Sequence, residues 1–355
     1  MNIPYRTRVM LQRLGLVALT VAVFAALAWF CWVIWLERYV VYGRDGKATL
    51  NFDLPEQAQT GEVARPPAAE GGISIYYNEG ADAVDSSGAL TQLSGYYITY
   101  EDLSKNLTEV TEELNFVPAG TAVMIELKGG YGSFYYSSGL SESISSASVN
   151  VTAVDELIKN LKSRGYYLIA RVSAFRDYNY GVNHVSSGLP LLNKPYLWMD
   201  DGGCYWLNPT DPIALGWITQ VVTELKDMGF HEVMLGDFRF PNSSEYRFKE
   251  DKEAALQTAA QTLLTNFASD TFTLSFCVTA PSFSLPDGSR SRLYLENVEA
   301  KDVESKASQC TLDTPDTRLV FLGTTNDTRF DAYGVLRPIA LAEALESQKA
   351  DMATN

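Results

Sequence analysis

Histidine is scarce in this chain of 355 residues, which contains only His184 and His231. Catalysis by histidine and metal sites built on histidine therefore have little material. Basic residues are also few, because 28 Lys and Arg stand against 43 Asp and Glu, for a formal net charge of -15. A nucleic-acid binder needs cations that displace counterions from phosphates. We therefore expect no nucleic-acid partner.

The four cysteines do not indicate a metal site. Cys31 lies in a long apolar run, and Cys204, Cys277 and Cys310 lack the paired spacings of zinc ligands. One disulfide outside the cytoplasm and three unpaired thiols are both compatible with this count. No phosphate-binding loop or dinucleotide fingerprint is present either. The sequence thus predicts neither a metal nor a cofactor.

Charge is absent from residues 14–36, LGLVALTVAVFAALAWFCWVIWL, which end among Trp29, Trp32 and Trp35. An uncharged run of this length can cross a bilayer, and tryptophans suit its interface with water. A cleaved signal peptide would have a shorter apolar region that ends in small residues. We therefore predict a transmembrane signal anchor over residues 14–36.

The charges on either side of this run set its expected orientation. Acidic residues contribute little to the positive-inside rule, so the two flanks are nearly equal and the N-terminal amine decides. We expect residues 1–13 to be a cytoplasmic tail and the large domain to be extracytoplasmic, on a single-pass protein of the cell membrane. The basic residues counted are Arg6, Arg8 and Arg13 before the run and Arg38, Arg44 and Lys47 after it.

Two further regions follow the anchor. Residues 37–94 are rich in proline, glycine and small residues, which is typical of a linker or stalk. Residues 95–355 alternate strand and helix patterns, which predicts an α/β domain with a parallel sheet. Six strands are expected, whereas a closed (β/α)8 TIM-like barrel needs eight. Either residues 293–295 and Val335 belong to the missing strands, or the barrel is incomplete or degenerate in its second half.

Polar residues occupy the carboxyl ends of three expected strands, where a parallel core normally carries Val, Ile or Leu. Side chains alternate along a strand, so Glu126 and Lys128 share one face, as do Asp237 and Arg239. Arg171 and Ser173 share a face of the strand between them. These groups can form an ion-pair network that closes the top of the barrel. Alternatively, two carboxylates that face one pocket can divide the roles of acid and nucleophile or base. We assign Asp237 to the second role and Glu126 to the first as hypotheses.

The long segment between residues 176 and 207 mixes aromatic and acidic residues. Sugar rings stack on aromatic faces while their hydroxyls bond to carboxylates, so this mixture favours carbohydrate binding. Packing of the tryptophans within the loop is the alternative. The expected substrate contacts are Asp177, Trp198, Asp201 and Trp206.

Four stretches occur together in order, namely VMIELKGGYGSFYYSS, GYYLIARVSAFRD, WMDDGGCYWLNPTDP and GFHEVMLGDFRFP. Over residues 95–241 they resemble the DUF4015 family, whose members are similar to TIM-barrel glycosidases distantly related to the α-amylase group. The resemblance implies a carbohydrate-active site. Its implied lining is Glu126, Lys128, Arg171, Asp177, Asp201, Asp237 and Arg239.

One departure from the family pattern falls in the site. The pattern runs FDYVRFP, whereas this chain has LGDFRFP, which places Gly236 under the family's acid and Asp237 one residue later. A shift of one residue turns a strand side chain to the opposite face. Either the strand end bulges and returns Asp237 to the pocket, or this chain lacks the principal carboxylate.

These observations leave two hypotheses for the function. The first is a membrane-anchored glycoside hydrolase that acts on an extracytoplasmic or cell-envelope polysaccharide. The second is a catalytically inactive barrel that binds glycan or serves as a structural or interaction module of the cell envelope.

Overall fold

The structure is a computed structural model that describes residues 29, 40–42, 48–50, 83, 89–267, 271–278, 283–286 and 289–353. It divides into two compact units, Met1–Ala68 and Ala69–Asn355. In the first unit, β1 (Val40–Tyr42) and β2 (Ala48–Leu50) pair antiparallel. Both strands fall within residues 37–94, which we expected to be a linker.

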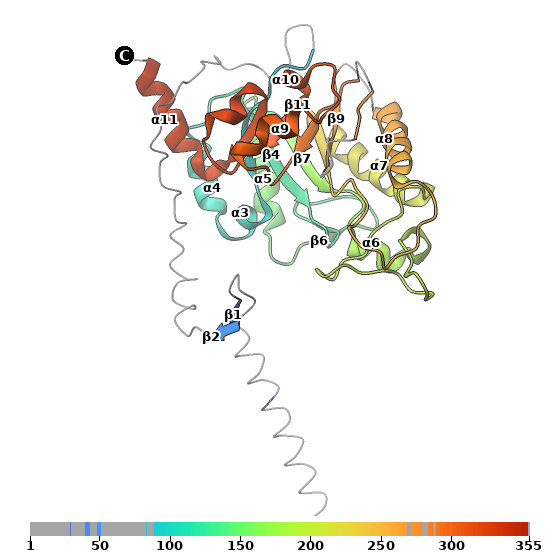
Figure 1. Ribbon diagram of the computed structural model, residues 1–355. Helices are drawn as coiled ribbons and strands as arrows, with labels where there is room; N and C mark the ends of the chain where they lie inside the picture. Colours follow the sequence, from blue (N-terminus) through green and yellow to red (C-terminus); the bar gives the residue numbers. More distant parts are fainter. Residues whose placement is uncertain are drawn as a thin grey trace, which may run out of the picture. The chain divides into compact units, whose positions relative to one another are not determined.

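The second unit contains a closed barrel of eight parallel strands that follow one another in chain order (Figure 1). Pairing of the first strand with both the second and the last closes it. Residues 293–295 and Val335 do lie in strands, so the alternative of an incomplete barrel is wrong. The strands are β3 (Ser94–Ile98), β4 (Ala122–Lys128), β7 (Tyr167–Ser173), β8 (Glu232–Gly236), β9 (Thr273–Cys277), β10 (Leu293–Leu295), β11 (Leu319–Leu322) and β12 (Gly334–Pro338).

The helices between the strands differ in length, and the longest, α5, α7 and α8, follow β4, β7 and β8. In the second half, only short helices and 3-10 turns connect β10 to β11 and β11 to β12. No helix occurs among the described residues between β9 and β10. The principal helices are α3 (Tyr100–Lys105), α4 (Leu107–Glu113), α5 (Val151–Ser163), α6 (Tyr178–Asn183), α7 (Pro212–Asp227), α8 (Lys252–Phe267), α9 (Val303–Ala307), α10 (Pro315–Arg318) and α11 (Ala342–Ala353).

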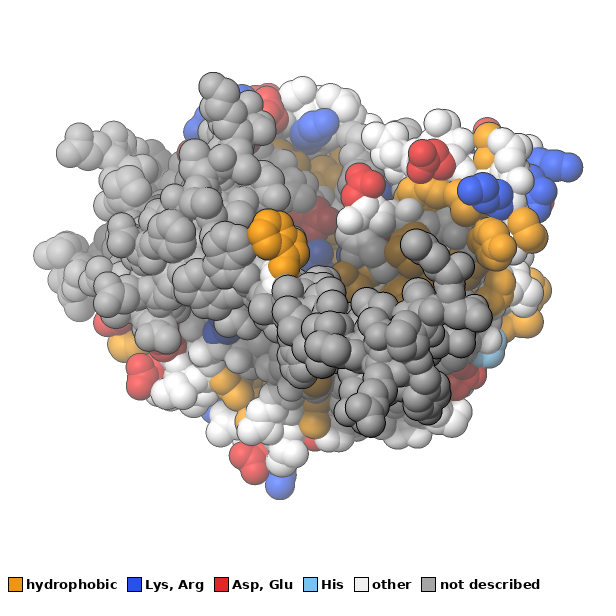
Figure 2. All heavy atoms as spheres, turned by 90° about the horizontal axis from the view of Figure 1, so that it is seen from below, with side chains coloured by type: hydrophobic (Ala, Val, Ile, Leu, Met, Phe, Trp, Pro, Cys, Tyr) orange, Lys and Arg blue, Asp and Glu red, His pale blue; other side chains and the backbone are white. Residues whose placement is uncertain are grey.

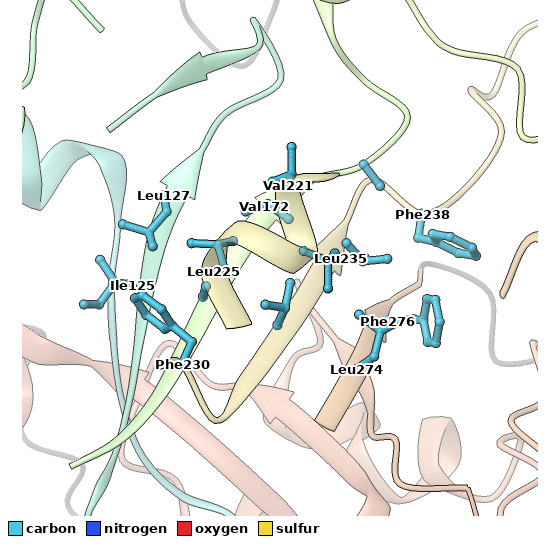
Figure 3. Close-up of a cluster of buried hydrophobic side chains, with 14 of the residues drawn as sticks. Ile125, Leu127, Val172, Val221, Leu225, Phe230, Leu235, Phe238, Leu274 and Phe276 are labelled. Carbon is cyan, nitrogen blue, oxygen red and sulfur yellow. The ribbon is translucent and has the colours of Figure 1, made fainter. Parts of the chain in front are cut away.

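Helix α7 shows why these residues fold in this way. Asp211 accepts hydrogen bonds from the backbone N–H groups of Ile213 and Ala214, and Pro212 fills the first turn. Its stripe at helical spacing includes Val221 and Leu225, which face the outer side of the barrel strands (Figure 3). Leu127, Val172 and Leu235 supply the other half of this core (Figure 3). They lie on the outer face of their strands, where every second side chain points.

The inside of the barrel holds a fully buried ion pair near the strand beginnings. Arg292 Nη1 lies 2.6 Å from Glu232 Oε2, and both side chains have an exposed fraction of 0%. Glu232 also accepts hydrogen bonds from Tyr167, Ser275 and Tyr294. The buried charges are therefore paired and hydrogen-bonded, which burial requires.

The predicted membrane anchor, residues 14–36, lies outside the described residues except for Trp29. Among the helices that are described, none has both the length and the apolar character to span a bilayer.

We predict that Arg292→Leu lowers the free energy of unfolding by about 3 to 5 kcal/mol, because Glu232 would remain charged and buried without its partner. Urea denaturation of the two proteins measures this difference. Arg329→Leu is the matched control, because Arg329 pairs with Asp327 at the surface, and it should leave stability unchanged. Equal stability of the Arg292 variant and the parent would contradict the prediction.

Candidate active site

The carboxyl ends of the eight strands meet at one mouth, where three carboxylates surround one arginine. Arg171 comes from β7, Glu126 from β4, Asp237 directly follows β8, and Glu296 directly follows β10. This mouth lies on the lower side of Figure 1, because α6 follows β7 there. Figure 2 shows acidic and basic side chains close together near the centre of this face. Parallel barrels carry their reactive groups at this end.

Arg171 is the central cation of the mouth. Its Nη2 donates a hydrogen bond to Glu296 Oε2 at 2.8 Å, and the two side chains are 27% and 28% exposed. Burial acts to lower the pKa of Arg171, but the charges of Glu296, Glu126 and Asp237 outweigh it and raise the pKa above its usual value. The guanidinium is therefore a permanent charge shared by all three carboxyl groups.

Asp237 reaches the mouth through an unusual backbone conformation. Its φ is 50°, in the left-handed region, and it follows β8 without any register shift between β7 and β8. Its Oδ2 lies 2.8 Å from Ser173 Oγ, and its Oδ1 lies 3.8 Å from Arg239 Nη2. A turn after the strand, and not a bulge within it, thus brings the carboxyl group beside Arg171 and Arg239.

Gly236 lies next to the same arginine. A Cβ atom at this position would lie 3.6 Å from Arg171 Nε, an ordinary contact distance. An acidic side chain at residue 236 would therefore point toward Arg171. Here Glu296 provides the carboxylate that pairs with this arginine.

Glu126 is half-buried and is tied to the helix that follows β3. Its Oε2 accepts a hydrogen bond from the backbone N–H of Tyr100, the first residue of α3, at 3.1 Å. The Tyr100 ring lies 4.9 Å from that of Tyr135. A register shift between Glu126 and Lys128 relative to β7 alters the end of β4.

Lys128 and Asp177 form a second buried ion pair. Their side chains are 2% and 1% exposed, with Lys128 Nζ 2.8 Å from Asp177 Oδ2. Asp177 also accepts hydrogen bonds from Tyr180 N and from Trp217 Nε1, while Lys128 donates to Ser173 O. We expected both residues to contact substrate, and the structure places them below the surface, where they hold the long loop onto the barrel.

The two expected tryptophans are also buried. Trp206 donates to Asp200 Oδ2 at 2.9 Å, and the Arg239 guanidinium lies 4.8 Å from its ring centre. Trp198 donates to Glu245 Oε2 at 3.2 Å and packs near Tyr246. Both rings therefore pack within the loop, which was the alternative to substrate binding. Asp201 lies exposed in a turn of the same loop.

The long loop and the turn after β4 also bring three tyrosines together, of which Tyr131 is exposed and Tyr178 and Tyr205 are half-buried. Tyr178 and Tyr205 stack with an interplanar angle of 8° and ring centres 5.3 Å apart. Tyr131 lies 6.2 Å from Tyr178, is 55% exposed and donates to Gly202 O. We call Tyr131, Tyr178 and Tyr205 the tyrosine platform.

Glu296 is the residue that the sequence patterns did not single out. It ends the short stretch LYLE, and three strand residues show too little alternation to place a side chain. One feature of the sequence could have indicated Glu296, namely an acid directly after the apolar triplet LYL. Asp237 similarly follows the apolar stretch VMLG.

Cys277 ends β9, the strand between those of Asp237 and Glu296. Burial raises the pKa of its thiol far above the usual value, so the group is neutral near pH 7. Cys204, Cys277 and Cys310 are all free thiols, as one of the two interpretations of the cysteine count expected.

We predict that Asp177→Ala lowers the free energy of unfolding by about 3 to 5 kcal/mol, because Lys128 would be left buried and unpaired. Asp201→Ala, in the same loop but exposed, serves as the control and should have wild-type stability. Urea denaturation compares the three proteins. A fully stable Asp177 variant that loses only ligand affinity would show that Asp177 contacts substrate.

Comparisons with known proteins identify one family. The model of DUF4015, described as "Putative glycosyl hydrolase domain", matches residues 95–275, just over half of the chain. No curated protein is significantly similar to the sequence.

Similarity to solved structures is remote. A hypothetical protein from Ruminiclostridium thermocellum aligns with a TM-score of 0.45 and 18% identity, over 51% of this chain and 96% of that protein. An α-galactosidase from Lactobacillus brevis gives 0.49 and 8% identity, over 72% of this chain and 40% of the enzyme. A chitobiase from Flavobacterium johnsoniae gives 0.43 and 9%, over 66% and 38%. The chain thus spans about two fifths of the length of these two enzymes.

Proposed function

The chain belongs to the DUF4015 family and carries a domain of the glycosyl hydrolase type, and from this we propose that it hydrolyses glycosidic bonds of an oligosaccharide or polysaccharide at the barrel mouth. The observation that carries the proposal is the grouping of Glu126, Asp237 and Glu296 around Arg171.

Glycoside hydrolysis needs this kind of arrangement. One carboxyl group gives a proton to the departing oxygen, and a second attacks the sugar or activates water. Asp237 and Glu126 are the pair suggested by the strand patterns, and Glu296 adds a third carboxyl group to the same mouth. Arg171 and Arg239 offset part of the negative charge and can orient sugar hydroxyls.

The tyrosine platform supports a sugar substrate. Arg176 joins it to the mouth. Ser173 Oγ contacts both Arg176 O and Asp237 Oδ2, and the Arg176 side chain borders Gly202, whose carbonyl oxygen accepts from Tyr131. Sugar rings can stack on the exposed faces of such tyrosines. Trp198 and Trp206 would act beneath this surface by supporting the loop.

Glycan binding without hydrolysis is the second candidate function. Gly236 favours it, because an acid at that position would face Arg171 and this chain has none there. The barrel would then serve as a binding or structural module of the cell envelope.

We expect the full-length protein, purified in detergent, to cleave at least one member of a panel of cell-envelope polysaccharides. Asp237→Asn should reduce the rate about 10²- to 10⁴-fold, the usual contribution of an acid or base, while glycan affinity is retained. Reducing-end release measures cleavage, and calorimetry measures binding. Binding by both proteins with cleavage by neither would favour the second function.

We further propose that residues 14–36 anchor the protein in the cell membrane with the large domain extracytoplasmic, on the strength of the uncharged run and the flanking charges. The chain should then remain in membranes after extraction at alkaline pH, and protease added to intact cells or spheroplasts should digest the domain. Arg38→Glu, outside the run, should not change membrane retention. Release of the parent protein by alkali would contradict the anchor.

A further inference from the structure

We infer that Glu296 is the catalytic carboxylate of this site, acting as base or nucleophile, and that Asp237 is the group that supplies the proton. This assignment rests on the proposed hydrolase function and differs from the roles suggested by the sequence patterns, in which Asp237 was the base and Glu126 the acid.

Glu296 has the placement that a catalytic carboxylate needs. It directly follows β10 at the mouth and is 28% exposed, so a ligand can reach it. One oxygen, Oε2, accepts a hydrogen bond from Arg171 Nη2 at 2.8 Å, which orients the carboxyl group. Asn297, the next residue, has a φ of 59°, and among the described residues only it and Asp237 are non-glycine residues with positive φ. Such conformations gather at functional sites.

Asp237 is held by a hydroxyl group and has a looser contact with a cation than Glu296. Ser173 Oγ donates to Asp237 Oδ2 at 2.8 Å and also lies 2.8 Å from Arg176 O. Arg239 Nη2 lies 3.8 Å from Asp237 Oδ1, whereas Arg171 Nη2 lies 2.8 Å from Glu296 Oε2. The group that supplies a proton is the one held less tightly by a cation. We therefore assign the role of acid to Asp237.

Glu126 has a different task. Its Oε2 is used by the backbone N–H at the start of α3, so the carboxylate holds the β3 to α3 connection. We therefore treat Glu126 as a positioning residue.

The strand order places the proposed pair at a suitable separation. β8 and β10 are separated only by β9, and neighbouring strands are about 4.8 Å apart, so the two strand ends are on the order of 10 Å apart. Side chains directed toward the barrel axis reduce this distance, and paired carboxyl groups of glycosidases are about 5 to 9.5 Å apart. Cys277, a small neutral residue, ends the strand between them.

The proposed reaction balances as the addition of one water. The Asp237 carboxyl proton passes to the glycosidic oxygen as the bond from that oxygen to the anomeric carbon breaks, and the electron pair leaves with the oxygen. Glu296 either bonds to the anomeric carbon, forming an ester that water then hydrolyses, or removes a proton from the water that attacks this carbon.

The test uses the full-length chain and two sets of substrates, methyl glycosides and 2,4-dinitrophenyl glycosides of glucose, galactose, mannose and N-acetylglucosamine in both anomeric forms. The dinitrophenolate leaves without a proton, so only the methyl glycosides need an acid. Glu296→Gln, which keeps an acceptor for Arg171, should lose about 10²- to 10⁴-fold activity on both sets. Asp237→Asn should lose a similar factor on methyl glycosides and less than about tenfold on dinitrophenyl glycosides. Glu126→Gln should change the activity on both sets by the same factor, because a positioning residue takes no part in proton transfer to the leaving group.

Azide separates chemistry from structural damage. Added azide should restore cleavage of dinitrophenyl glycosides by Glu296→Ala and yield a glycosyl azide, because the small anion replaces the missing carboxylate, whereas a misfolded variant is not rescued. Circular dichroism checks that each variant is folded. Near-parental activity of Glu296→Gln, or a loss confined to methyl glycosides, would overturn the assignment alone. A parent protein that binds glycans and cleaves no substrate would overturn the proposed function together with the assignment.

Discussion

The ion pair between Glu232 and Arg292 connects most of the barrel. Glu232 lies on β8 and accepts from residues of β7, β9 and β10. Arg292 precedes β10 and also donates to Ala83 O and Thr91 O before β3, and to Thr317 O before β11. Two charges without exposure to solvent are stable only with nearly all their hydrogen bonds made. One geometry satisfies them, and that geometry aligns strands from both halves of the chain.

The alignment of the strands at their beginnings determines which residues meet at their carboxyl ends. Parallel strands in register bring their last residues to one mouth, so Arg171, Asp237 and Glu296 meet although the chain positions of the first and last differ by 125. The mouth therefore does not need a complete ring of long helices. Short connections after β10 and β11 are compatible with the same site, because the interior network also joins the beginnings of β10 and β11.

The sequence predicted the parts of the fold that depend on local periodicity. Six strands were expected from alternation, a pattern that acts over a few residues and that β4 shows clearly. β10 and β12 were ambiguous, since three to five residues carry little pattern, and Glu296 was missed with β10. Trp198 and Trp206 show a further limit. Composition indicates that aromatic and acidic residues lie in one loop, but burial depends on Asp200 and Glu245, whose proximity only the tertiary fold creates.

The turn at Asp237 shows how an acid directly after a strand can reach the mouth, although strand alternation would turn it to the other face. Alternation holds only within the strand, and β8 ends at Gly236. Asp237 then adopts φ of 50°, a conformation that aspartate accepts more readily than most residues, and its carboxyl group reaches Ser173 and Arg239. Glu296, which follows β10, provides the carboxylate that pairs with Arg171. The mouth therefore receives its carboxyl groups from strand ends on both sides of β9.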